Sequence, residues 1–135
     1  MRQFLDRAAV SFAAGAFGAL ANSVALWAAG AYELTARLGV AIAPALTASW
    51  LYPRLVWGGL WGFLFLLPLR GSWWLRGLVV ILAPSAYQLL WVVPQRTAHG
   101  LFGLRLGALT PAFVLAANAV WGLAAAWLLR ATGRA

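Results

Sequence analysis

The feature of this sequence that most constrains its fold is a long uncharged apolar run near the N-terminus, residues 8–32. The charged residues Arg2, Asp6 and Arg7 precede it. A charged start followed by an apolar run also describes a signal peptide, whose apolar region is usually only about 7–15 residues long. The run here is longer, and a transmembrane helix needs about 20 apolar residues. We therefore expect a retained transmembrane helix.

The composition extends this interpretation to the whole chain. Hydrophobic residues make up 64% of the 135 residues and charged residues only 9%. Because soluble domains carry about 25% charged residues, a soluble monomer of this composition would expose large apolar patches. An integral membrane protein removes that difficulty. The alternative is a very apolar soluble subunit buried in a complex.

The start of the second apolar segment is open between Pro44 and Pro53, because proline is favoured at a first helical position. A helix from Pro53 to Leu67 would be too short for a hydrocarbon core of about 30 Å. A start near Pro44 gives enough length, with a bend at Pro53. It places Arg54 inside the apolar layer or just under the head groups.

Two more apolar segments follow. The third helix is expected from about residue 74 to 93 with Pro84 inside it, and the fourth from Thr110 to about 129. Thr110 can cap the fourth helix, and Pro111 suits its first position. The connectors at 33–50 and 95–110 are expected at the membrane interface. The predicted fold is an all-α polytopic membrane protein with four transmembrane helices.

Small residues at helical spacing predict how these helices pack. Lipid gives no hydrophobic force between helices, so association relies on close backbone approach at small side chains. The residues predicted to make these contacts are Gly15, Gly18, Gly58, Gly62 and Gly122.

The two halves of the chain share an order of motifs. Arg-Leu-Gly occurs at 37–39 and at 105–107, and Val-Trp-Gly occurs at 56–58 and at 120–122. We interpret the chain as one membrane domain with two tandem two-helix repeats, residues 8–70 and 74–130. Because two helices return the chain to its starting side, the repeats would be parallel, about an axis along the membrane normal.

Four polar residues interrupt the apolar helices and form a candidate polar interior: Asn22, Arg54, Gln88 and Asn118. In the repeat, Asn22 matches Gln88 and Arg54 matches Asn118, so all four are expected to converge. They would line a path for an anionic or zwitterionic ligand. Alternatively they form interhelical hydrogen bonds that only fix packing, worth about 0.6 kcal/mol each, and Arg54 snorkels to the head groups.

Catalytic and metal chemistry have little support in this sequence. The only histidine is His99, in a connector, and the two acids, Asp6 and Glu33, lie at opposite ends of the first helix. Cysteine is absent. A metal site or a general acid–base pair needs several such groups together. We therefore expect no enzyme activity, no metal and no cofactor.

The basic residues are ten arginines, which give a net charge of +8. They fall singly between apolar runs instead of forming one patch, so we expect them to mark helix ends and to touch anionic lipids, not nucleic acid. Arginines are more frequent on the side of the two termini. This bias predicts a multi-pass membrane protein with both termini in the cytoplasm.

Two functions fit these patterns. The first is a non-catalytic membrane protein that acts through helix–helix association, as a homo-oligomer or as a small subunit of a membrane complex. The second is a small transporter, channel or lipid-handling protein with a path lined by Arg54 between the repeats.

The second half also resembles a known group of proteins. Gln88, the Gly-Ala-Leu-Thr-Pro segment at 107–111 and the Val-Trp pair at 120–121 resemble the small bacterial inner-membrane proteins of the YagU type. The long polar insertions associated with that type are absent here. The resemblance implies an inner-membrane location and no particular functional residues.

Overall fold

The computed structural model describes residues 1–40, 42, 44–92 and 109–133, and this part of the chain is helical without strands. The predicted connector that holds His99 and the second Arg-Leu-Gly lies almost wholly outside the described residues. The elements are α1 (Arg2–Ala31), α2 (Leu34–Arg37), α3 (Ala48–Gly62), the 3₁₀-helix η1 (Phe63–Leu66), α4 (Trp73–Val80), α5 (Leu82–Tyr87), the π-helix η2 (Gln88–Val92) and α7 (Thr110–Ala131).

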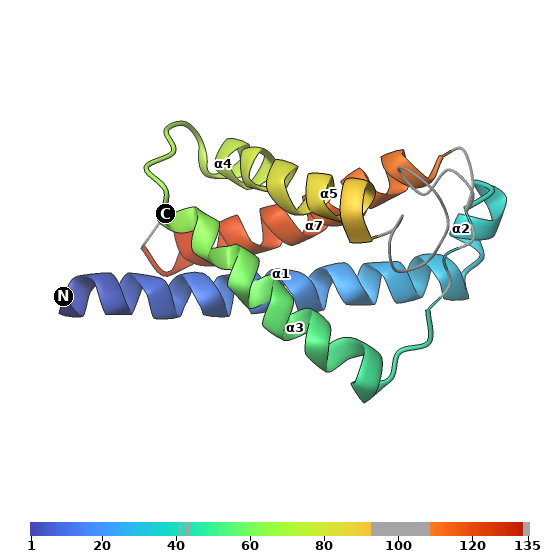
Figure 1. Ribbon diagram of the computed structural model, residues 1–135, viewed down its shortest axis with the longest axis horizontal. Helices are drawn as coiled ribbons and strands as arrows, with labels where there is room; N and C mark the ends of the chain where they lie inside the picture. The colour runs from blue at the N-terminus through green and yellow to red at the C-terminus, as the bar shows by residue number, and fades with distance from the viewer. Residues whose placement is uncertain (41, 43, 93–108, 134–135) are drawn as a thin grey trace.

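The long helix α1 forms one side of the bundle, and α3 crosses it obliquely (Figure 1). The helix α7 packs along α1 and also contacts α4. The start of α1 and the end of α7 lie at the same end of the bundle, and α2 lies at the opposite end (Figure 1). Following the chain, α1 and α4 run in one direction, and α3 and α7 run in the other.

Three helical segments are long and apolar enough to cross a membrane: Arg2–Ala31, Trp73–Trp91 and Thr110–Ala131. The predictions of an all-helical chain and of membrane-length apolar helices are confirmed at this level. The first helix begins earlier than the apolar run, because Arg2, Asp6 and Arg7 belong to α1 as well. Its Ala-rich sequence contains no proline, and the glycines that precede Gly30 within it, Gly15 and Gly18, are buried where neighbouring helices pack.

The predicted start of the second helix near Pro44 is wrong by about one turn. The helix α3 begins at Ala48, because Thr47 has an extended backbone and its hydroxyl accepts a hydrogen bond from the Trp50 amide at 3.3 Å. Pro53 lies inside α3, as expected for the longer of the two alternatives. After Gly62 the helix tightens into η1 and ends before Pro68.

The third apolar segment is interrupted near its middle. The α-helix changes at Ile81 between α4 and α5, three residues before Pro84. Proline has no N–H, so the carbonyl of Val80 loses its usual helical donor and the helix cannot continue unbroken. The π-helical turn from Gln88 to Val92 then ends the segment.

The predicted capping role of Thr110 is wrong. Thr110 is the first residue of α7 and Leu109 holds the cap position, without a side-chain capping bond. The Thr110 hydroxyl is buried and has no hydrogen-bond partner among the residues that the structure describes. Pro111 lies in the first turn, where its missing N–H is harmless, as predicted.

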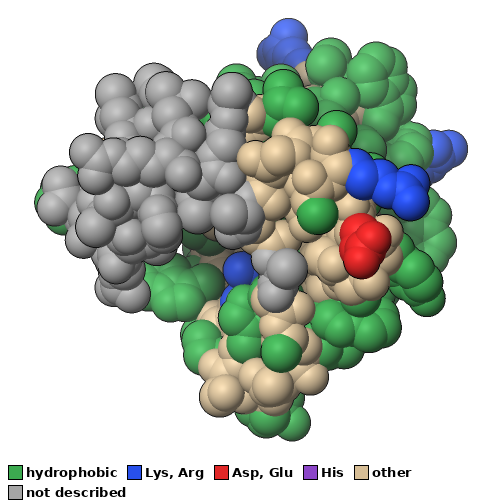
Figure 2. All heavy atoms as spheres, turned by 90° about the vertical axis from the view of Figure 1, so that its right-hand side faces the viewer, with side chains coloured by type: hydrophobic (Ala, Val, Ile, Leu, Met, Phe, Trp, Pro, Cys, Tyr) green, Lys and Arg blue, Asp and Glu red, His purple; other side chains and the backbone are tan. Residues whose placement is uncertain are grey.

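Polar and apolar side chains are distributed opposite to the pattern of a soluble protein. The buried residues include Asn22, Ser23 and Asn118, whereas Leu82 is 62% exposed and Trp127 is 51% exposed. Apolar side chains exposed in this way suit lipid better than water. At the end of the bundle that carries α2, basic and acidic side chains lie among apolar and backbone atoms (Figure 2).

Glycines lie where helices approach most closely. A Cβ added at Gly15 would collide with the backbone of Gly58 and Gly62, and one added at Gly18 would lie 2.5 Å from the Trp121 carbonyl oxygen. The structure therefore places the five glycines named above at helix contacts. It adds Gly77, whose Cβ would lie 2.6 Å from the carbonyl oxygen of Gly122.

We expect Gly15→Ala to lower the free energy of unfolding by about 1–3 kcal/mol, because the backbones of α1 and α3 must separate to admit the methyl group. Unfolding by SDS in mixed micelles measures the change. Ala13→Leu adds more bulk on an exposed position of α1 and is the control, with an expected change within about 0.5 kcal/mol. Equal stability of Gly15→Ala and wild type would contradict the contact.

Candidate functional site

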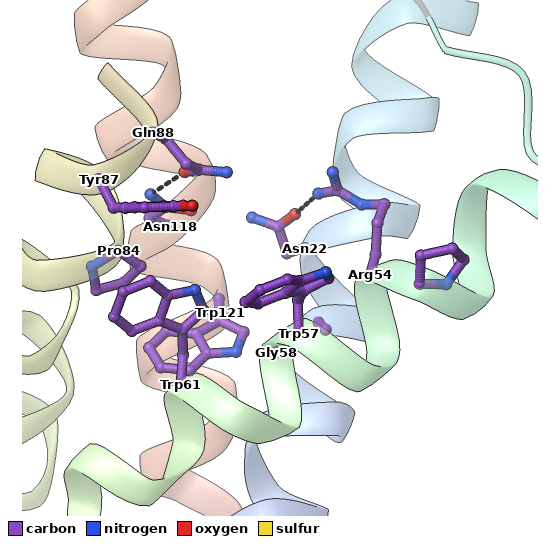
Figure 3. Close-up of a pocket in the computed structure, with 12 residues that line it drawn as sticks. Asn22, Arg54, Trp57, Gly58, Trp61, Pro84, Tyr87, Gln88, Asn118 and Trp121 are labelled. Atoms are coloured by element: carbon purple, nitrogen blue, oxygen red, sulfur yellow. Dashed lines mark hydrogen bonds between the residues drawn. The ribbon is translucent and has the colours of Figure 1, made fainter. Parts of the chain in front are cut away.

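A cavity of about 290 Å³ lies between α3 on one side and α5 and α7 on the other (Figure 3). Its lining combines polar side chains, aromatic rings and small or cyclic residues. The lining residues are Asn22, Arg54, Gln88 and Asn118, then Trp57, Trp61, Tyr87 and Trp121, and Ala19, Gly58, Pro53 and Pro84. The structure thus brings together all four residues of the candidate polar interior.

Arg54 of α3 is held on three sides by residues of α1 and α3, which we call the first helix pair; the segment from α4 to η2 and α7 form the second. Its Nε donates to the Ser23 hydroxyl at 2.9 Å, and one terminal nitrogen donates to the Asn22 amide oxygen at 2.5 Å. The guanidinium carbon lies 4.7 Å from the centre of the Trp50 ring, within the range of a cation–π contact. These contacts fix the orientation of the guanidinium instead of leaving it to reach freely toward the head groups.

Asn118 of α7 is held by hydrogen bonds to the segment that runs from α5 to η2. Its amide nitrogen donates to the Ser85 hydroxyl at 2.8 Å and to the Gln88 amide oxygen at 2.7 Å. Asn118 is 8% exposed and Ser85 is 2% exposed, so these bonds are shielded from solvent. A buried amide without such partners would be unfavourable by about 1–3 kcal/mol.

Two hydrogen bonds join the helix pairs beside the cavity. The Asn22 amide nitrogen donates to the Ala117 carbonyl at 2.6 Å, and the Trp121 indole nitrogen donates to the Gly15 carbonyl at 2.9 Å. Trp121 is only 5% exposed. Both bonds link α1 to α7, so this side of the bundle is closed by polar contacts as well as by packing.

The electrostatic character of the cavity is positive and rich in donors. The partners of Arg54 within the described residues are neutral, and the acids Asp6 and Glu33 lie near the two ends of α1. A guanidinium has five N–H donors, and the two hydrogen bonds to Ser23 and Asn22 use two of them. The amide nitrogen of Gln88 and the hydroxyl of Tyr87 also point toward the cavity (Figure 3).

Aromatic rings form the remaining walls. Trp61 of α3 and Tyr87 of α5 pack with their ring centres 5.7 Å apart and bridge the two helices. Trp57 and Tyr87 line the cavity and are 54% and 39% exposed. The cavity therefore lies close to the outer surface between α3 and α5.

Several of these residues were missed from the sequence. Ser23 and Ser85 orient Arg54 and Asn118, and a signal for them exists: each follows a packing glycine, Gly15 or Gly77, by the same number of residues. That spacing is about two helical turns and puts each serine on the face of its glycine. Trp121 has no comparable signal, because its motif partner Trp57 has the same neighbours but an exposed ring.

We expect Trp121→Phe to destabilise the protein by about 1–3 kcal/mol, because it removes the hydrogen bond to Gly15 and leaves unfilled space in the interior. Trp127→Phe changes a half-exposed indole of the same helix and is the matched control, expected within about 0.5 kcal/mol. Thermal unfolding in detergent compares the two variants. Similar losses in both would argue against a special role of the Trp121 bond.

Comparison with protein-family models, with curated proteins and with solved structures finds no match. The resemblance to the YagU type stays a prediction. The basis for a functional proposal is the chemistry of the cavity.

Proposed function

We propose that this chain is a non-catalytic integral membrane protein that binds a small anionic group between two pairs of membrane-crossing helices. One observation carries the proposal: the Ser23 hydroxyl and the amide oxygens of Asn22 and Gln88 accept hydrogen bonds from Arg54 or Asn118, while further donors on Arg54, Gln88 and Tyr87 face the open space. A cluster of donors around a guanidinium is suited to a carboxylate or a phosphate.

The position of Arg54 within an apolar bundle supports a binding role. An arginine at membrane depth is energetically expensive and usually marks a ligand or ion pathway. Here the guanidinium is fixed by Ser23, Asn22 and Trp50. A residue that served packing alone could be a neutral amide, as Asn118 is in the second pair.

The proposal includes a fourth membrane crossing by α3 and η1. Together they cover residues 48–66, and 15 α-helical and 4 3₁₀-helical residues extend over roughly 30 Å. That length matches the hydrocarbon core. The four crossings would be α1, α3 with η1, α4 to η2, and α7.

Matching contacts in the two helix pairs support the tandem repeat. In the first pair, Gly15 meets Gly58 and Ser23 bonds Arg54; in the second pair, Gly77 meets Gly122 and Ser85 bonds Asn118. In both pairs the residue that donates to the serine lies one helical turn before the packing glycine of its own helix: Arg54 before Gly58, and Asn118 before Gly122. We therefore interpret residues 8–70 and 74–130 as related units that enclose the site.

The association function has less support than the binding function. Its main argument was the small-residue faces, and Gly15, Gly58 and Gly122 all pack against helices of the same chain. Assembly with further copies or with another membrane protein would have to use a different surface. The large exposed apolar side chains are the ones that we expect to contact lipid.

We expect both termini to be in the cytoplasm and the α2 end to face the opposite side. The chain has no cysteine, so the single substitutions Arg2→Cys, Leu46→Cys and Thr132→Cys report position cleanly. A membrane-impermeant maleimide should label Leu46→Cys in spheroplasts, and the other two only after lysis. Labelling of Arg2→Cys and Thr132→Cys from opposite sides would contradict the even number of crossings.

We expect benzoate or phenyl phosphate, used as probes, to stabilise the purified protein in detergent against thermal unfolding. At ten times its Kd, a ligand that binds only the folded state adds about 1.4 kcal/mol. Arg54→Gln should abolish this stabilisation. Arg130→Gln is the matched control, because Arg130 also lies over a tryptophan, 5.6 Å from the Trp73 ring centre, but outside the cavity.

The comparison is made at constant ionic strength against chloride. The proposal fails if neither probe stabilises the wild-type protein, or if Arg54→Gln responds to them as the wild type does.

A further inference from the structure

The side of the cavity that is not closed by helix packing lies between α3 and α5. On the other side, α1 and α7 are in direct contact through Gly18 and Trp121 and through the bond from Asn22 to Ala117. Between α3 and α5, the Trp61–Tyr87 ring pair bridges the gap. Among the described residues, this is the side that would face lipid in a bilayer, so a lateral route into the cavity is available between α3 and α5.

The depth of Arg54 is compatible with a lipid head group. The helix α3 begins at Ala48, so Arg54 lies about 9 Å along it. Trp50 and Tyr52, in the first turns of α3, are the residue types that concentrate at the head-group level. A phosphate at that level has to move by only a turn or two of helix to meet the guanidinium.

The size of the cavity limits what part of a lipid it can hold. A volume of about 290 Å³ corresponds to roughly ten water molecules at about 30 Å³ each. This is enough for a phosphate with a small polar substituent. The acyl chains would extend out of the cavity along Trp57 and Tyr87, which line it and are partly exposed.

The charge of the site selects among head groups. Arg54 has neutral partners within the described residues, and the other donors that face the cavity, on Gln88 and Tyr87, are neutral. The site therefore has a net positive charge. An anionic phospholipid neutralises it, whereas a zwitterionic one brings a further cation into the same space.

We infer that the occupant of the cavity is the phosphate head group of an anionic phospholipid, which enters from the bilayer between α3 and α5 and binds to Arg54, Gln88 and Tyr87. This inference rests on the proposed anion-binding function and names its ligand. It makes the protein a lipid-binding one, with one head-group site per chain.

The experiment is a titration of delipidated protein with phosphatidylglycerol, followed by native mass spectrometry. We expect one tightly retained lipid on the wild type and on Arg130→Gln, and at least tenfold weaker retention on Arg54→Gln. Phosphatidylethanolamine should bind more weakly than phosphatidylglycerol to the wild type. Equal retention of phosphatidylglycerol by Arg54→Gln and wild type overturns the inference.

A competition experiment with a water-soluble phosphate distinguishes binding of the lipid from binding of its head group alone. Glycerol 3-phosphate carries the same phosphate without acyl chains and should compete only at concentrations far above those of the lipid. If it, or the aromatic anions used above, binds in an Arg54-dependent way while phosphatidylglycerol does not, the lipid inference fails and the anion-binding function stands. If none of these ligands binds in an Arg54-dependent way, both the lipid inference and the proposed anion-binding function are wrong.

Tyr87→Phe is a second test of the inference, for the case that Arg54→Gln does not fold. It removes one hydroxyl and keeps the ring that packs on Trp61. We expect about threefold to tenfold weaker retention of phosphatidylglycerol by this variant. If Arg54→Gln does not fold, unchanged retention by Tyr87→Phe overturns the inference.

Discussion

Close approach of helix backbones at glycine is the constraint on which the rest of this structure depends. Gly58 is one turn after Arg54, and Gly122 is one turn after Asn118, so the packing glycine and the polar side chain share a helix face. With the backbones in contact at Gly15 and Gly58, the short side chain of Ser23 reaches the guanidinium. A larger residue at the crossing would separate the helices and break that bond.

Much of the helical framework could be predicted, because its cause is local. Long uncharged runs predict membrane-length helices, and the three such segments in the described residues follow from composition alone. Helix boundaries were less predictable. Thr47 instead of Pro44 sets the start of α3, and Thr110 enters α7 instead of capping it. In both places several residues suited the boundary. A local hydrogen bond to Thr47 marks the start of α3, whereas α7 starts without a side-chain capping bond.

The site could be predicted in part, for a similar reason. Polar side chains in apolar helices avoid lipid, so the gathering of Asn22, Arg54, Gln88 and Asn118 follows from their rarity. Which atoms accept and which donate does not follow from the sequence. The roles of Ser23 and Ser85 depend on helix crossings far apart in the chain. Trp57 and Trp121 have the same local motif and opposite exposure, so no local rule could assign them.

The different exposure of Trp57 and Trp121 suggests why a cavity exists between the helix pairs. Two related helix pairs about a common axis would form two equivalent contacts between the pairs, α1 with α7 and α4–α5 with α3. The first contact is closed, because Trp121 turns inward and bonds to Gly15. Its counterpart Trp57 is half-exposed and lines the cavity, which lies where the second contact would be. In the arrangement that we propose, the ligand site thus lies at the contact between the helix pairs that is left open, whereas the equivalent contact between α1 and α7 is closed. Arg54, the member of its pair that carries a charge, lines the open half together with Asn118.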